Sequence, residues 1–316
     1  MRRNEFLLFI CGLVIGGLIA VTLHKYSDTS LRPVRSPEVS QYNFVSTRTE
    51  TTTCAAESTA KNISNVRVLC WVMTSPMTLF TKAVHVRDTW GRRCDKILFM
   101  SSEDNEKLPA IGLGVKEGRE HLYDKTAAAF QYIWTHHKDE ADWFLKADDD
   151  TYVIIENLKL LLKDHDPYLP MYFGRKFTPM VKQGYMSGGA GYVLSKAALS
   201  RFDRATRTQR CIPLDSNEDL EIGRCMQHIG VKTMDSRDPE KKETFFPFSP
   251  ALHILPGNIP KDSWYWKYIA HPNPSGPGCC SKHMISFHYV QPDMMHIIHH
   301  FIYRMEAYGV KAQSYV

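Results

Sequence analysis

The chain has 316 residues, of which 43% are hydrophobic, so it is long enough to fold into one large or two small domains with a real core. Its formal net charge of +5 is small for this length. Nucleic-acid binding requires a concentrated basic face, which this composition does not indicate, so that class of function is excluded.

The first distinctive segment is an uncharged apolar run at 6–23, FLLFICGLVIGGLIAVTL. At about 1.5 Å per residue, a helix of this length spans about 27 Å, close to the hydrocarbon thickness of a thin membrane. Arg2 and Arg3 precede the run, so the positive-inside rule assigns residues 1–5 to the cytoplasm. The alternative is a cleaved signal peptide, but its apolar region is usually shorter, and no small-x-small cleavage site follows Leu23. The sequence therefore favours a retained type II anchor.

Residues 24–65 have the composition of a stem. They are rich in Ser and Thr, contain Pro33 and Pro37, and include few large apolar residues. Such a segment buries too little surface to offset the entropy lost on ordering. Asn62 begins an Asn-Ile-Ser glycosylation sequon, which the predicted anchor would bring into the lumen. The remainder, 66–316, is the predicted folded domain.

Eight cysteines suit a lumenal, oxidising compartment. Six lie in the predicted folded domain: Cys70, Cys94, Cys211, Cys225, Cys279 and Cys280. We hypothesise that the first four pair in sequence order, first with second and third with fourth. The adjacent last two either form a ring with each other or pair elsewhere. A zinc site is the alternative, but no paired Cys-x-x-Cys spacing supports it.

Strand and helix patterns alternate through the first half of this domain. Apolar runs predict buried strands at 66–74, 96–101 and 142–146. Helical spacing of apolar residues predicts helices at 83–90, 117–137 and 154–163. The alternation predicts an α/β fold with a mostly parallel sheet that helices cover on both sides. Ligands of such sheets bind beyond the carboxyl ends of the strands.

Three consecutive acids, Asp148, Asp149 and Asp150, follow the third predicted strand. Adjacent carboxylates repel one another, and a folded protein tolerates them best when a cation neutralises them. Carboxylate oxygens suit hard ions such as Mg²⁺ and Mn²⁺. The alternative is a helix cap, with Asp150 ahead of a helix that begins near Val153. In a chain with a type II anchor, the triplet favours a metal site that offsets the charge of a sugar-nucleotide diphosphate.

Three further segments carry candidate site residues. The glycines of 184–195, GYMSGGAGYVLS, either let the backbone approach a ligand closely or form a tight structural loop before a helix. Glu218 and Asp219 open a helical pattern at 220–229. They either stabilise the helix N-terminus, or one of them is the general base that accepts a proton from an attacking sugar hydroxyl, which gives inversion. His288 ends an apolar strand. It is either a structural histidine, which is the more frequent case for a lone histidine, or a third ligand beside the acids.

Five long motifs occur in one order along the chain: RVLCWVMTSP, HVRDTWGRRCDKILFMSSE, ADWFLKADDDTYVIIENL, YMSGGAGYVLSKAAL and GPGCCSKHMISFHYV. Together they resemble the core 1 β1,3-galactosyltransferases from about Val66 to Gly309 and, more distantly, other β1,3-glycosyltransferases, including the fringe-type enzymes. The resemblance implies a GT-A fold in a single-pass type II Golgi membrane protein, with the catalytic domain, 66–316, in the lumen. It also implies Mn²⁺-dependent, inverting transfer from UDP-galactose to GalNAc α-linked to Ser or Thr, which makes the core 1 disaccharide Galβ1-3GalNAc of mucin-type O-glycans.

The resemblance also implies roles for single residues. The implied metal ligands are Asp150 and His288, and the implied base is Asp219, with Glu218 as the second candidate. The residues implied near the nucleotide are Thr74, Arg87, Lys125, Asp148 and Asp149. The residues that would stack on the acceptor sugar or peptide are Trp264, Tyr265 and Trp266.

The implied partners are UDP-galactose, glycoproteins that bear GalNAc and a second copy of the chain in a homodimer. A close relative of these enzymes is a membrane-bound chaperone for them, so a dedicated chaperone is a further candidate partner. Two alternative functions stay open: a related β1,3-glycosyltransferase with another donor or acceptor, and a chaperone without turnover. The chaperone lacks the acidic triplet, which this chain keeps at 148–150, so the sequence resembles the enzymes.

Overall fold

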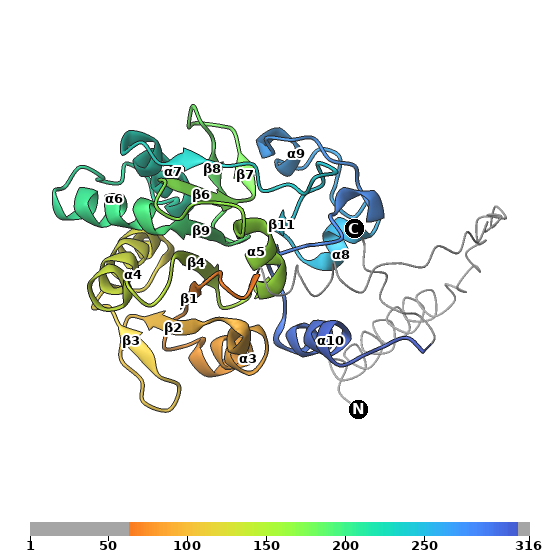
Figure 1. Cartoon of the computed structure of the whole chain (residues 1–316), viewed down its shortest axis with the longest axis horizontal. Coiled ribbons are helices and arrows are strands. Elements are labelled where there is room, and N and C mark those ends of the chain that lie inside the picture. Colours follow the sequence, from red (N-terminus) through yellow and green to blue (C-terminus); the bar gives the residue numbers. More distant parts are fainter. Residues whose placement is uncertain (1–62, 309–316) are drawn as a thin grey trace, which may run out of the picture. The chain divides into compact units, whose positions relative to one another are not determined.

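The structure, a computed structural model, describes residues 63–308 (Figure 1). The predicted anchor at 6–23, most of the predicted stem and the sequon at Asn62 lie outside the described residues. Within 63–308, no helix combines the length and the apolar character needed to cross a bilayer.

A seven-stranded mixed sheet, with the order β10-β6-β9-β4-β1-β2-β3, forms the centre of the domain. Its strands are β1 (Val68–Met73), β2 (Lys96–Ser101), β3 (Ala110–Gly112), β4 (Trp143–Asp148), β6 (Met171–Gly174), β9 (Tyr192–Ser195) and β10 (Lys232–Thr233). β1 runs parallel to both β2 and β4, and Met73 pairs with Asp148 at the carboxyl end. Only β9 runs against its neighbours, β4 and β6, within this sheet. The prediction of a mostly parallel sheet is therefore confirmed.

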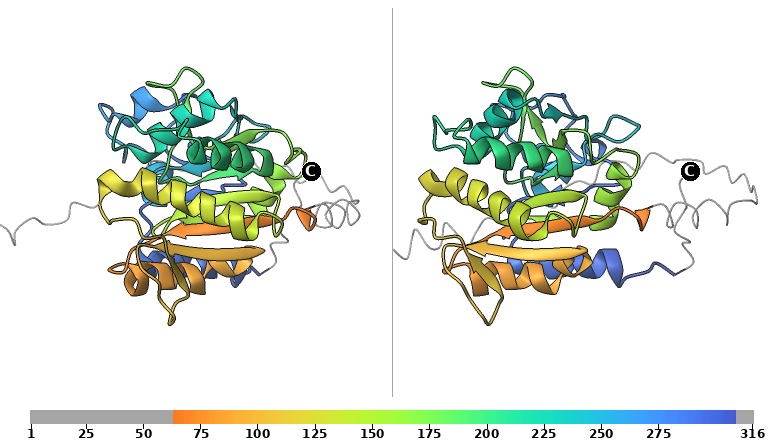
Figure 2. Two further views of the ribbon diagram at one scale, coloured as in Figure 1. Left: turned by 90° about the vertical axis from the view of Figure 1, so that its left-hand side faces the viewer. Right: turned by 60° about the vertical axis from the view of Figure 1, so that its left-hand side comes forward.

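Helices cover both faces of this sheet (Figures 1 and 2). Because side chains alternate along β1, Val68, Cys70 and Val72 enter one hydrophobic core, while Leu69, Trp71 and Met73 enter the other. The first core also contains residues of α3 (Val84–Asp88), α5 (Ile155–Leu162) and α10 (Pro292–Tyr303). The second contains residues of α4 (Leu122–His137), α6 (Lys196–Arg207) and α7 (Glu218–His228). Burial on both faces explains the continuous apolar run that predicts β1.

The remaining elements are short. A three-stranded sheet has the order β11-β12-β5, from Phe245–Phe246, Ser286–Phe287 and Tyr152–Val153. A hairpin joins β7 (Lys176–Phe177) to β8 (Tyr185–Met186). The short helices are the π-helical turn η1 (Leu79–Ala83), the 3₁₀ turns η2 (Trp90–Arg93), η3 (Arg119–His121) and η4 (Pro277–Cys279), and the α-helices α8 (Pro250–Ile254) and α9 (Tyr265–Tyr268). These segments build much of the pocket described below.

Three disulfides join Cys70 to Cys94, Cys211 to Cys225, and Cys279 to Cys280. The hypothesis of pairing in sequence order is confirmed, and the adjacent pair forms a bond with itself. The first bond links β1 to the segment just before β2. The second fastens the chain after α6 to α7.

Candidate active site

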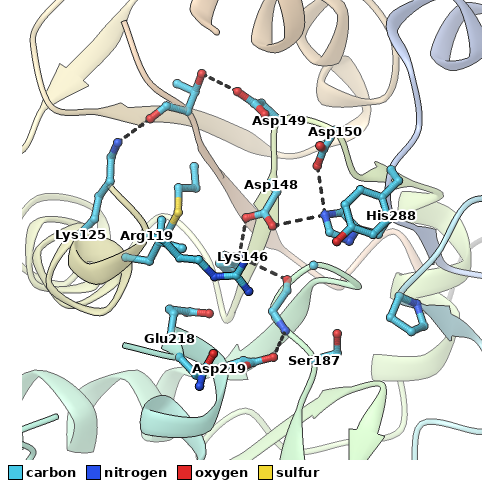
Figure 3. Close-up of a pocket in the computed structure, with 18 of the residues that line it drawn as sticks. Arg119, Lys125, Lys146, Asp148, Asp149, Asp150, Ser187, Glu218, Asp219 and His288 are labelled. Carbon is cyan, nitrogen blue, oxygen red and sulfur yellow. Dashed lines mark hydrogen bonds and ion pairs between the residues drawn. The ribbon is translucent and has the colours of Figure 1, made fainter. Parts of the chain in front are cut away.

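A pocket of about 450 Å³ opens at the carboxyl ends of β1 and β4, a volume typical of small-molecule sites (Figure 3). Its lining comes from both halves of the domain. Residues after β1 and β4, the glycine-rich loop and the start of α7 contribute Thr74, Thr78, Asp148, Asp149, Asp150, Ser187, Gly188, Gly189, Glu218 and Asp219. Residues from the chain after β11 contribute Phe248, Trp264, His288 and Tyr289.

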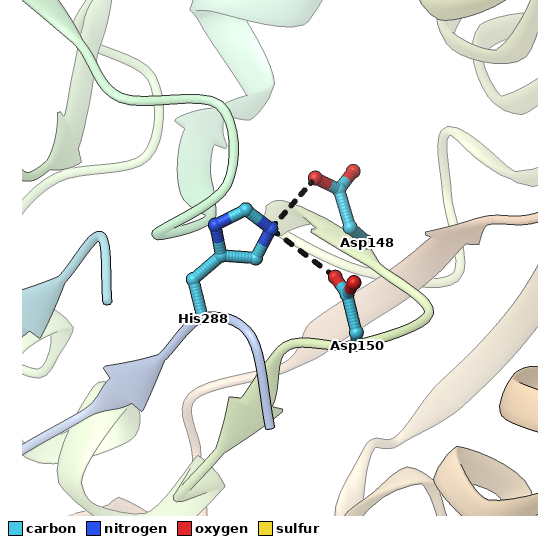
Figure 4. A group of neighbouring side chains, drawn as sticks. All are labelled: Asp148, Asp150 and His288. Atoms are coloured by element: carbon cyan, nitrogen blue, oxygen red, sulfur yellow. Dashed lines mark ion pairs between the residues drawn. The ribbon is translucent and has the colours of Figure 1, made fainter. Parts of the chain in front are cut away.

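Asp148, Asp150 and His288 converge on one point (Figure 4). β12 pairs with β5, which directly follows the acids, and this pairing brings His288 to the triplet. The Nε2 atom of His288 lies 3.1 Å from Oδ1 of Asp150 and 3.7 Å from Oδ2 of Asp148. One donor atom from each residue lies within 4.8 Å of the others. Two carboxylates and one imidazole form a donor set that suits a divalent ion such as Mn²⁺.

The glycine-rich loop packs directly on these side chains. A Cβ atom at Gly189 would collide with the ring of His288, and one at Gly188 would lie 2.7 Å from Oε2 of Glu218. The Gly188 N–H donates to Asp219, and the Gly189 carbonyl accepts from Thr151. The glycines of 184–195 therefore let the backbone approach closely, and what it approaches is the side chains of the site.

The acids of the triplet have different surroundings. The Lys82 ammonium donates to Oδ2 of Asp150 at 3.0 Å. Burial alone would raise the pKa of Asp150, but His288 and Lys82 outweigh it and lower that pKa to about 2. Asp149 instead accepts from the Thr74 hydroxyl at 2.9 Å, and burial raises its pKa to about 6. The helix-cap interpretation of Asp150 is wrong, because α5 begins at Ile155 and has no side-chain cap.

Lys146 interacts electrostatically with both sets of acids in the pocket, the triplet at 148–150 and the pair Glu218 and Asp219. It is buried, its Nζ lies 2.5 Å from Oδ1 of Asp148, and it donates to the Gly188 carbonyl at 3.2 Å. Burial would lower its pKa, but the charges of Asp148, Glu218 and Asp219 raise it above the usual lysine value. Our sequence prediction missed this residue; its signal is a lysine inside an otherwise apolar strand, two residues before the triplet.

Glu218 and Asp219 occupy the first turn of α7 and differ in accessibility. Glu218 is buried, and its Oε1 accepts from Thr126 at 3.0 Å and from Tyr192 at 2.7 Å. Asp219 keeps more solvent contact and accepts from the Gly188 N–H at 3.1 Å through Oδ2. Burial raises the pKa of both carboxyls. Asp219 is thus the more accessible acceptor of a proton.

The comparisons with known proteins agree with this arrangement. Residues 80–239 match a family model described as Fringe-like. The chain is 52% identical over 245 residues to glycoprotein-N-acetylgalactosamine 3-beta-galactosyltransferase 1 of Xenopus laevis, which covers 77% of this chain and 68% of that protein. This chain belongs to the Fringe-like family. The resemblance to β1,3-glycosyltransferases is thereby confirmed.

Two other relatives of this Fringe-like protein are longer. A beta-1,3-glucosyltransferase of Mus musculus is 27% identical over 60% of this chain and 35% of its own length. Chondroitin sulfate glucuronyltransferase of Homo sapiens is 30% identical over 57% of this chain and 26% of its own length. This chain therefore spans about a third or less of their lengths.

Of the residues predicted to contact a nucleotide in this Fringe-like domain, some line the pocket and one does not. Thr74 and Lys125 line the pocket, and the buried Lys125 ammonium donates to the Thr74 carbonyl at 2.7 Å. Arg87 does not line it, because it lies on α3 and pairs with the neighbouring Asp88. Our prediction missed Arg119, which reaches into the pocket in Figure 3. A single exposed arginine before a helix carries no sequence signal.

Of the three aromatic residues predicted for the acceptor, only Trp264 lines the pocket, where it is half-exposed. Tyr265 is fully buried, and its hydroxyl accepts from Arg175 at 2.6 Å. Trp266 lies outside the lining and donates to the Pro260 carbonyl. Tyr289 is a second exposed aromatic residue of the pocket lining, and its ring stacks on that of His288 at 3.8 Å between centroids.

Proposed function

We propose that this Fringe-like protein transfers galactose from UDP-galactose to the 3-hydroxyl of GalNAc α-linked to Ser or Thr, with inversion, on a GT-A fold. The convergence of Asp148, Asp150 and His288 opposite Asp219 in one pocket is the observation that carries the proposal. The choice of galactose and GalNAc rests on the 52% identity to the Xenopus enzyme with that name.

The metal-holding residues in this proposal are Asp148, Asp150 and His288, and the ion is Mn²⁺. When bound, such an ion offsets the negative charge that develops on the UDP leaving group. Lys146 holds Asp148 in place from a buried position, and the close glycine loop fixes the ring of His288.

Asp219 is the proposed general base, and the buried Glu218 beside it in the sequence is the second candidate. As the acceptor 3-hydroxyl oxygen bonds to the anomeric carbon, the bond from that carbon to the diphosphate oxygen breaks, and the hydroxyl proton passes to Asp219. Burial raises the pKa of Asp219, which makes its carboxylate a stronger base. The Gly188 N–H holds Oδ2, which aims the carboxylate at the pocket.

Thr74, Lys125 and Asp149 are the proposed nucleotide side of the pocket, and Trp264 the proposed acceptor side. We further propose that the protein is a homodimer and that it is a Golgi membrane protein of type II topology. A dedicated chaperone is a candidate partner. The apolar run at 6–23 and three disulfides, which suit an oxidising lumen, support this location.

The test is a transfer assay with the full chain purified in detergent, UDP-galactose, MnCl₂ and a peptide that carries GalNAc-α-Thr. We expect a β1,3-linked galactose product that disappears on addition of EDTA and returns with Mn²⁺. A folded protein that binds UDP without forming product would indicate another donor or acceptor, which UDP-glucose and UDP-glucuronic acid would probe. Failure to bind UDP would favour a chaperone without turnover.

A further inference from the structure

Two lysines of very different exposure contact the carboxylates of the proposed metal site. The side chain of Lys146 is 3% exposed and holds Asp148, whereas that of Lys82 is 35% exposed. The Lys82 Nζ lies 3.0 Å from Oδ2 of Asp150 and 3.9 Å from Oδ1 of Asp149. Lys146 is fixed by its burial, whereas Lys82 has room to move on a flexible stem.

The backbone that carries Lys82 has an unusual helical form and is linked to the triplet by hydroxyl contacts. Lys82 belongs to η1, a single π-helical turn. Such turns are rare in proteins, and those that occur often lie at functional sites. Leu79 and Ala83 of the same turn are buried in the core. The Thr78 hydroxyl before the turn lies 3.1 Å from that of Thr74, which in turn donates to Asp149. The turn therefore has a fixed place beside the acids, with Lys82 directed at them.

Asp150 has one oxygen for each of two partners, an imidazole and an ammonium. Its Oδ1 faces the Nε2 of His288 at 3.1 Å, and its Oδ2 faces the Lys82 ammonium at 3.0 Å. A divalent ion held by Asp150 and His288 must share this carboxylate with the ammonium. Like charges repel at such distances, so the lysine has either to withdraw or to weaken the ion's hold.

We propose that Lys82 is a built-in competitor of the divalent ion, an inference that rests on the metal site of the proposed function. Its ammonium partly neutralises Asp149 and Asp150 and lowers the affinity of the protein ligands for the ion. The ion is then held firmly only when further negative oxygens, those of a nucleotide diphosphate, join the site. Lys82 thus makes retention of the ion depend on the donor nucleotide.

The test measures Mn²⁺ binding to the full chain from the electron paramagnetic resonance signal of free Mn²⁺, with and without UDP. Without UDP, Lys82→Met should bind Mn²⁺ about three- to tenfold more tightly than the wild type. UDP should then enhance Mn²⁺ affinity less in the variant than in the wild type. Lys82→Arg keeps the charge and should behave as the wild type. Lys159→Met, which removes an ion pair with Asp95 away from the pocket, is the matched control for general charge effects.

Unchanged or weaker Mn²⁺ binding in Lys82→Met would overturn the proposal, since the lysine would then be neutral or hold Asp150 in place. Lys82→Gln carries the same expectation and decides the question should the methionine variant fail to fold. If the wild type binds Mn²⁺ no better than Asp150→Ala, the metal site of the proposed function is itself wrong. That result is distinct from failure of the competitor role alone.

Discussion

The two walls of the pocket differ in the length of the elements that build them. The wall with the acid triplet extends from β1 and β4, whose strands pair in register over six residues and are buried on both faces. The opposite wall comes from the chain after β10, in which β11 and β12 have two residues each and α9 has four. These short elements still bury apolar side chains: Phe245, Phe246 and Phe287 lie in the first core, and Tyr265 and Ile269 lie in a separate smaller cluster.

A buried polar network also joins this second wall to the central sheet. Arg175, which directly follows β6, is 1% exposed, and its Nη1 forms an ion pair with Oε2 of Glu243 at 2.6 Å. Its Nη2 donates to the hydroxyl of Tyr265 at 2.6 Å and to Asn273 at 2.8 Å. One guanidinium thus joins the sheet to three segments of the wall. Apolar burial, which is non-directional, contributes to both walls, and directional bonds through Arg175 add to it in the second.

Asp150→Ala removes a proposed metal ligand from the first wall and should have the largest effect on the transfer rate. Transfer should fall at least about 10³-fold, because the site loses a carboxylate ligand of the proposed ion. Product formation from UDP-galactose, measured beside Mn²⁺ binding, checks this. Asp164→Ala, which changes an exposed acid, should retain wild-type turnover. An Asp150→Ala enzyme with more than a tenth of wild-type activity would contradict the metal assignment.

Asp219→Asn tests the proposed base, which the first turn of α7 places in the same pocket. We expect a loss of about 10²- to 10⁴-fold in turnover. Mn²⁺-dependent UDP binding should persist, because the amide oxygen can still accept from the Gly188 N–H. Turnover and calorimetric titration of UDP measure the two effects separately. Loss of UDP binding would make Asp219 a binding residue instead of a base.

Arg175→Met tests the second wall. The substitution leaves Glu243 buried without its partner, which should lower the free energy of unfolding by about 3–5 kcal/mol. Denaturant unfolding measures this. The double variant with Glu243→Leu should recover much of the loss, because an apolar pair replaces the ion pair. Arg207→Met breaks a half-exposed pair and should cost at most about 1 kcal/mol. Equal losses for both arginines would show that the network does not hold the wall.

The two walls also differed in how far the sequence could predict them. β1, β2, β4 and α4 follow from local apolar patterns, and the triplet follows from its place after a strand. The network does not, because Arg175 and Glu243 are 68 positions apart and neither stands in a periodic segment. Two-residue strands such as β12 are also too short to show alternation. The sequence marks His288 as a candidate ligand, but the pairing of β12 with β5, which brings it to the acids, leaves no local pattern.

The aromatic run at 264–266 shows a second limit of the sequence. Successive residues of a helical turn point about 100° apart, so three neighbours cannot all face one pocket. α9 begins at Tyr265, and the structure accordingly buries Tyr265, directs Trp266 to the Pro260 carbonyl and leaves only Trp264 on the pocket wall.

Trp264→Ala should give the smallest effect of the series and tests the proposed acceptor side. The ring makes edge contacts with four aromatic neighbours but is 49% exposed, so its removal should leave the fold intact. We expect the KM for the GalNAc peptide to rise about five- to tenfold, since a lost aromatic contact is worth about 1 kcal/mol, with UDP binding unchanged. Steady-state kinetics with Trp266→Ala as the matched control checks this. A comparable rise in KM for Trp266→Ala would mean that the acceptor extends beyond the pocket over the outside of α9, and that the second wall recognises peptide as well as sugar.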